Sequence, residues 1–147
     1  MGVLTDYFVA RDDQDAARAH SAVGGPGKAG FKTAAWKSID PVVTLAVLNE
    51  IVSGTDAIEW IKTHGGDVEM VAGGKDDERW VFRIAPIHVD ALAQLPDDVR
   101  PIAERWAKSE ELDGADPKDL AEVLRDLRAL AREARASSKQ LYCWVSL

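Results

Sequence analysis

The chain has 147 residues, a formal net charge of −7, a single cysteine, and shares of 46% hydrophobic and 29% charged residues. This length suits one hydrophobic core, so we expect a single domain over residues 1–147. One cysteine excludes an internal disulfide framework and a cysteine-rich zinc site, and the negative charge disfavours nucleic acid as a partner.

The N-terminal half predicts one strand followed by helices. Residues 3–10 are typical of a short strand, and Asp12 or Asp13 can cap a helix that runs to about residue 22. Residues 31–39 are irregular or extended. Asp40-Pro41 favours the start of a second helix through residue 52, which is apolar on nearly all sides and is therefore expected to be central. A short helix from residue 55 or 56 to about residue 64 follows.

A glycine-rich loop over residues 24–30 contains the pair Gly27-Lys28. A phosphate-binding loop requires a glycine five positions before that Gly, and serine or threonine after the Lys. Ala22 and Ala29 occupy these positions, so we expect no nucleotide cofactor.

The second half predicts a β-hairpin and then more helices. Residues 67–72 and 79–85 alternate in polarity around a Gly-rich turn, as a hairpin does. Pro86 ends the hairpin, and short helices are expected over residues 87–95 and from about residue 97 to residue 112.

The last 32 residues predict a long helix that leads directly into a strand. Asp116-Pro117 is a helix start, and the apolar residues that follow recur in steps of three and four along one face. These are Leu120, Val123, Leu124, Leu127, Leu130, Ala131 and Ala134. The side chains of residues 141–147 alternate between two faces, as in a strand. An unpaired strand this apolar would promote aggregation, so we expect it inside the sheet between two partner strands. We expect Cys143 to be a core residue.

Together these elements predict an α+β fold. We expect about four strands, mostly antiparallel, which comprise the first strand, the last strand and the central hairpin. Five or six helices pack on this sheet, and pairing of the first and last strands closes it.

Two sets of residues are candidates for a binding site. Residues 16–39 contain no Asp or Glu, and there Lys32, Trp36 and Lys37 predict contact with an anionic ligand or an acidic protein. The alternative is a solvated loop with Trp36 in the core. His64 and Glu69 are close in sequence and could form an acid–base pair or a single metal site, although a histidine at a helix end is the more common arrangement.

Aromatic rings can line pockets, and Trp36 and Trp144 are the two tryptophans that apolar spacing does not assign to the core. Trp60, Trp80 and Trp106 fit apolar faces. One hypothesis is therefore a small-ligand binder or enzyme with a pocket near Trp36, His64, Glu69 and Trp80. No cofactor or metal is expected.

Some segments resemble a group of small bacterial proteins of unknown function. The resemblance rests on the opening residues 1–8 with Met1-Gly2 and Tyr7-Phe8, on residues 39–41, and on the ending over residues 141–144. It implies a single α+β domain whose long helix runs into a final apolar strand, and it implies no active site. Abundant Ala, Arg, Asp and Val also suggest a GC-rich bacterial genome.

The function that the sequence favours is a small acidic cytoplasmic interaction module without catalysis. No apolar run reaches the roughly 18 residues of a membrane span, and Asp6 and Asp12 interrupt the region that a signal peptide would occupy. We expect no membrane partner. The negative charge of the chain suits a partner protein with a basic surface, as immunity and inhibitor proteins have. A homodimer is also compatible with this function.

Overall fold

The computed structural model describes residues 3–54, 56, 58–59, 62 and 68–147. Its described part contains one antiparallel sheet of five strands, in the order β2-β1-β5-β4-β3. The strands are β1 (Leu4–Ala10), β2 (Thr33–Lys37), β3 (Val68–Ala72), β4 (Arg79–Ile84) and β5 (Gln140–Ser146). The α+β class and the antiparallel sheet are confirmed, with one strand more than the four expected from the sequence.

The additional strand is β2, in the region expected to be irregular or extended. Its sequence, TAAWK, has two adjacent alanines and so lacks a clear alternation of polarity. It becomes a strand because it pairs with β1 along its whole length, from Leu4 opposite Lys37 to Phe8 opposite Thr33. Tertiary pairing rather than local propensity decides this element.

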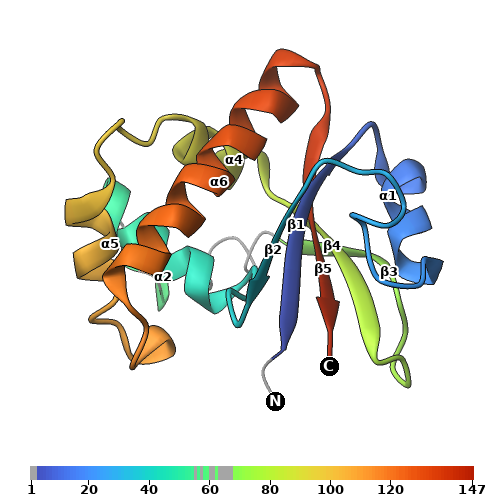
Figure 1. Cartoon of the computed structure of the whole chain (residues 1–147), viewed down its shortest axis with the longest axis horizontal. Coiled ribbons are helices and arrows are strands. Elements are labelled where there is room, and N and C mark those ends of the chain that lie inside the picture. Colours follow the sequence, from blue (N-terminus) through green and yellow to red (C-terminus); the bar gives the residue numbers. More distant parts are fainter. Residues whose placement is uncertain (1–2, 55, 57, 60–61, 63–67) are drawn as a thin grey trace.

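β5 lies in the middle of the sheet, between β1 and β4, as predicted (Figure 1). The first and last strands also pair as predicted, with Tyr7 opposite Cys143. Cys143 is fully buried, and burial raises the pKa of its thiol well above the usual value. The cysteine is therefore a core residue, as expected, and not a reactive thiol.

Helices cover both faces of the sheet (Figure 1). On one face α6 (Pro117–Ala136) packs across β1, β2 and β5, and further helices pack against α6 and against one another. Those helices are α2 (Val43–Ser53), α4 (Pro86–Ala93) and α5 (Arg100–Trp106). The opposite face carries α1 (Asp13–Ser21). A 3-10 turn, η2 (Glu110–Leu112), lies between α5 and α6.

α6 has the predicted apolar stripe, and all seven residues named for it are buried in the main core. α2 differs from the prediction of a central helix, because Val43 at its start and Val52 near its end are 40% and 38% exposed. The helix expected from residue 55 or 56 to His64 falls largely outside the described residues. Among the described helices, none is both long and apolar enough to cross a bilayer.

A buried glycine, Gly25, allows the loop after α1 to pack closely against the sheet. Gly25 has a φ of +84°, and a Cβ atom there would lie 3.1 Å from the Trp144 ring. Gly30 has a similar φ of +93° but open space around it. Both Gly→Ala variants incur the left-handed backbone penalty of about 1–2 kcal/mol, and Gly25→Ala adds a steric clash. Chemical denaturation should therefore show Gly25→Ala to be the less stable variant, and equal stabilities would contradict this packing.

Candidate functional site

A cleft of about 690 Å³ lies between β2 and the segment that leads into α6. This volume falls within the range of roughly 300–1,000 Å³ that is usual for ligand sites. One wall comes from β1, β2 and the residues just after β2: Leu4, Asp6, Ala35, Trp36, Lys37, Ser38 and Ile39. The other wall comes from residues 111–116 and from the first turns of α6, at Asp119, Leu120 and Val123.

Hydrogen bonds from β1 fix the segment that follows β2. The Thr5 hydroxyl donates to the Trp36 carbonyl (3.3 Å) and accepts from the Ile39 amide (3.1 Å). The buried Tyr7 hydroxyl donates to the Ile39 carbonyl (2.5 Å). The Asp40 carboxylate then accepts from the amides at the start of α2, which ends the extended segment. This wall of the cleft is therefore rigidly attached to the sheet.

The charge of the cleft is strongly negative. Among the described residues that line it, five are carboxylates and one, Lys37, is a cation. Two of the carboxylates stabilise α6: Asp116 accepts from the Lys118 amide as the N-cap, and Asp119 lies in the first turn. Negatively charged side chains at the N-terminus of a helix are stabilised by the positive end of the helix dipole. Asp6 has no such role, because it lies in the middle of a strand.

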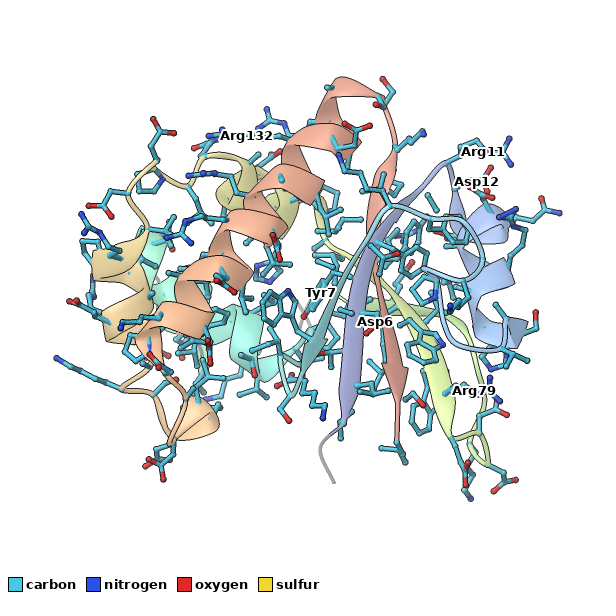
Figure 2. The ribbon with its side chains drawn as sticks, viewed as in Figure 1. Asp6, Tyr7, Arg11, Asp12, Arg79 and Arg132 are labelled. Atoms are coloured by element: carbon cyan, nitrogen blue, oxygen red, sulfur yellow. The ribbon has the colours of Figure 1, made fainter. Side chains whose placement is uncertain are left out.

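Asp6 is a half-buried carboxylate for which the described residues supply no partner. No hydrogen bond or ion pair joins its side chain to another described residue. Burial raises the pKa of the Asp6 carboxyl from 3.8 to about 6. Figure 2 shows Asp6 and Tyr7 on opposite sides of β1, so the Asp6 side chain lies on the face of the sheet away from α6. The cleft, whose other wall lies on the α6 side, reaches Asp6 around the edge strand β2. A buried charge that lacks a partner lowers stability, which makes Asp6 a candidate for function.

The pKa of Asp6 gives a testable pH dependence. Between about pH 4 and pH 6 the folded state binds more protons than the unfolded state, so the free energy of unfolding falls as pH rises through this range. Asp6→Asn removes the buried charge. We expect this variant to melt at a higher temperature than the wild type at about pH 7.5, and to show no such gain at about pH 3.5. The matched control Asp76→Asn removes the same charge from an exposed hairpin turn. An equal gain at both pH values would contradict the burial of an ionised Asp6.

Trp36 supplies the aromatic surface of the cleft. It lies on the α6 side of β2, where it packs partly into the main core. Its indole N–H is buried and has no acceptor among the described residues. The sequence left open whether Trp36 is a core residue or lines a pocket, and in the structure it does both.

Two of the candidate residues named from the sequence lie in this cleft, and a third lies elsewhere. Trp36 and Lys37 line the cleft. Lys32 instead lines a separate groove of about 410 Å³, with Arg11, Arg18 and other residues. The Lys32 ammonium lies 3.8 Å from a Glu133 carboxylate oxygen, so this groove is not a simple anion site.

The other candidates do not meet Trp36 in one pocket. Glu69 lies on β3, at the opposite edge of the sheet from β2, four strand spacings away or about 19 Å. Its carboxylate pairs with Arg83. Trp80 lies on the other face of the hairpin and donates to the Gly74 carbonyl (3.0 Å). His64 lies outside the described residues. The single pocket expected near Trp36, His64, Glu69 and Trp80 is therefore not formed by its described members.

The sequence analysis did not identify the carboxylates of the cleft. Glu111, Asp113, Asp116 and Asp119 all occur near helix ends, where capping explains them. Asp6 did carry a signal, because it is the one charged residue within β1, a strand that is otherwise mostly apolar. The described part of the chain holds no cluster of residues suited to a metal ion. No known family model, curated protein or solved structure matches the chain.

Proposed function

We propose that this protein is an acidic interaction module whose cleft beside β2 binds a basic surface of another protein. The observation that carries the proposal is Asp6, a half-buried carboxylate that no described residue neutralises. A cation from a partner would restore the electrostatic energy that burial removes, and the surrounding carboxylates would speed its encounter. We place this role in a bacterial cytoplasm. There the protein would act as immunity or inhibitor proteins do, which are also small and acidic and bind a basic protein.

The edges of the cleft support a protein partner over a small molecule. Glu111, Asp113 and Asp116 are exposed, and they follow one another along one wall rather than converging on a point. A row of exposed charges of one sign suits an extended surface with several cations. Net charge alone would give only weak, salt-sensitive attraction, so the half-buried Asp6 is needed for specificity.

A variant that neutralises the cleft tests this function. Asp6→Asn, Glu111→Gln and Asp113→Asn together remove three charges and leave the two carboxylates that stabilise α6. The wild type and this variant serve as baits in native lysate, and the recovered proteins are quantified by mass spectrometry. We expect a basic protein to be recovered in stoichiometric amount by the wild type and to be lost from the variant.

The control removes three charges far from the cleft, through Asp76→Asn, Glu78→Gln and Asp97→Asn. This control bait should recover the same partner as the wild type. Recovery that falls equally with both triple variants would show that only net charge matters. Recovery of no stoichiometric partner by the wild type would contradict the proposed function.

A further inference from the structure

The free edge of β2 forms part of the cleft, and its backbone is available for pairing. The Val9 amide donates to the Lys32 carbonyl (3.3 Å), and the Ser38 amide donates to the Val3 carbonyl (2.9 Å). In an antiparallel ladder, residues that bond to the neighbouring strand alternate with residues that point away from it. The N–H and C=O groups of Thr33, Ala35 and Lys37 therefore point away from β1, toward the free edge.

Nothing in the described chain uses these groups. β2 is the last strand of the sheet, and no hydrogen bond joins the backbone of Ala35 or Lys37 to another described residue on the open side. Ala35 and Lys37 are exposed, and both line the cleft. An open edge of this kind is a template for an added strand.

We propose that the cleft binds its partner by strand addition: an extended basic segment of another protein pairs antiparallel with β2. This inference rests on the proposed function and specifies how that binding occurs. The antiparallel direction matches every other pairing in the sheet.

The side chains around β2 define the sequence that the added strand would need. Ala35 pairs with Asp6, and both lie on the sheet face away from α6. A partner residue opposite Ala35 would place its side chain on that same face. Because Ala35 is small, a lysine or arginine there can extend over it to the Asp6 carboxylate.

On the other face of β2 the neighbours of the partner strand would be Trp36 and the apolar side chains of Leu120 and Val123. Partner residues next to the lysines or arginines would therefore be apolar. The occupant is a segment in which basic and apolar residues alternate, with the basic side chains on the Asp6 side. A second copy of this chain does not fit this description, because its β2 (TAAWK) has no alternation of basic and apolar residues. The carboxylates that line its own cleft beside β2 would also approach those of the first copy, and like charges repel.

Synthetic peptides test the proposal by isothermal titration calorimetry with the full chain. The probe is a capped peptide of sequence Thr-Ser-Val-Lys-Val-Lys-Thr, whose second residue is left uncharged because it would lie opposite Lys37. A version with Glu in place of Lys is the charge control. Two further versions carry N-methyl groups, one on the lysine amides and one on the valine amides. In antiparallel pairing opposite Ala35, the lysine amides point to β2 and the valine amides point away from it.

We expect the parent and N-methylvaline peptides to bind alike, and the N-methyllysine peptide to bind at least about ten-fold more weakly, since each lost hydrogen bond weakens binding. The Glu peptide should not bind. If all Lys peptides bind equally, strand addition is contradicted while the proposed function stands. If the N-methylvaline peptide alone is weakened, the antiparallel register is contradicted. If no Lys peptide binds, both proposals fail.

Two variants of the protein give an independent measurement. Asp6→Asn should weaken the parent peptide about ten-fold, whereas the matched control Asp76→Asn should not change its affinity. Ala35→Pro removes an amide that faces the open edge, where proline is tolerated, and should abolish binding while circular dichroism remains native. A dimer that forms in the wild type and is lost in Ala35→Pro would assign the edge to a second copy and contradict the proposal.

Discussion

Removal of residues 140–147 is expected to abolish folding. β5 pairs with β1 over all seven residues from Leu4 to Ala10 and with β4 over the five residues from Arg79 to Arg83. The truncation removes four core side chains, Leu141, Tyr142, Cys143 and Trp144, each of which is at most 5% exposed. Burial of a large side chain contributes about 1.5–3 kcal/mol, and a domain is stable by only about 5–15 kcal/mol in total. The lost burial alone is comparable with that total, and the lost pairing of β5 with β1 and β4 adds to it, so the truncated chain should not fold.

Circular dichroism and one-dimensional NMR measure this result. The truncated chain should lose its dispersed amide signals and its cooperative thermal transition. The control removes Leu147 alone, which is 72% exposed, although its amide donates to the Glu78 carbonyl. That shorter deletion should leave the fold intact. A cooperative transition in the chain that ends at residue 139 would show that β5 is not the centre of the sheet.

Trp106→Ala is expected to lower the free energy of unfolding by about 3–5 kcal/mol. Trp106 is fully buried in the main core, and its indole N–H donates to the Thr44 carbonyl of α2 (3.2 Å). The side chain thereby fixes α5 against α2. The substitution leaves a large cavity and removes this hydrogen bond, and both effects act in the same direction.

The same substitution should loosen the outer wall of the cleft. The Trp106 carbonyl accepts from both the amide (3.0 Å) and the hydroxyl (2.6 Å) of Ser109, which hold the turn before residues 111–116. The variant keeps this carbonyl, but a shift of the α5 backbone toward the cavity would displace it and the turn that it holds. Denaturation in urea measures the stability change, and hydrogen exchange measures the mobility of the turn. Val23→Ala is the control, since Val23 is 89% exposed and its truncation should change stability by less than about 0.5 kcal/mol. A loss below about 1 kcal/mol for Trp106→Ala would contradict the burial of this side chain.

The sequence predicted those helices and strands whose own pattern of apolar residues matches the way they are buried in the fold. α6 has an apolar stripe at steps of three and four, and β5 is apolar on both faces, which suits a strand between two partners. The start of α6 was readable because Asp116 caps it directly. β2 was not readable, because two adjacent alanines give no alternation and only the pairing with β1 defines the strand.

The cleft could be predicted only in part. Trp36 was named as a residue that could line a pocket, and it does. Asp6 and Asp113 are more than 100 positions apart, and only the packing of β2 beside α6 brings them to one cleft. Glu69 and Trp80 seemed suited to share a site with Trp36, but the strand order places Glu69 on the opposite edge strand, β3, and Trp80 on the strand beside it, β4. The order of these residues along the chain did not reveal the order of their strands in the sheet.

The most direct test of the proposed cleft is a ¹H–¹⁵N NMR titration of the full chain with the alternating Lys-Val peptide. The account predicts that the largest shift changes occur at the amides of Ala35 and Lys37 and in residues 111–116, and that the Ala35 amide becomes protected from exchange with solvent. Changes concentrated at other acidic surfaces, such as the hairpin turn around Asp76, with Ala35 unaffected, would contradict it.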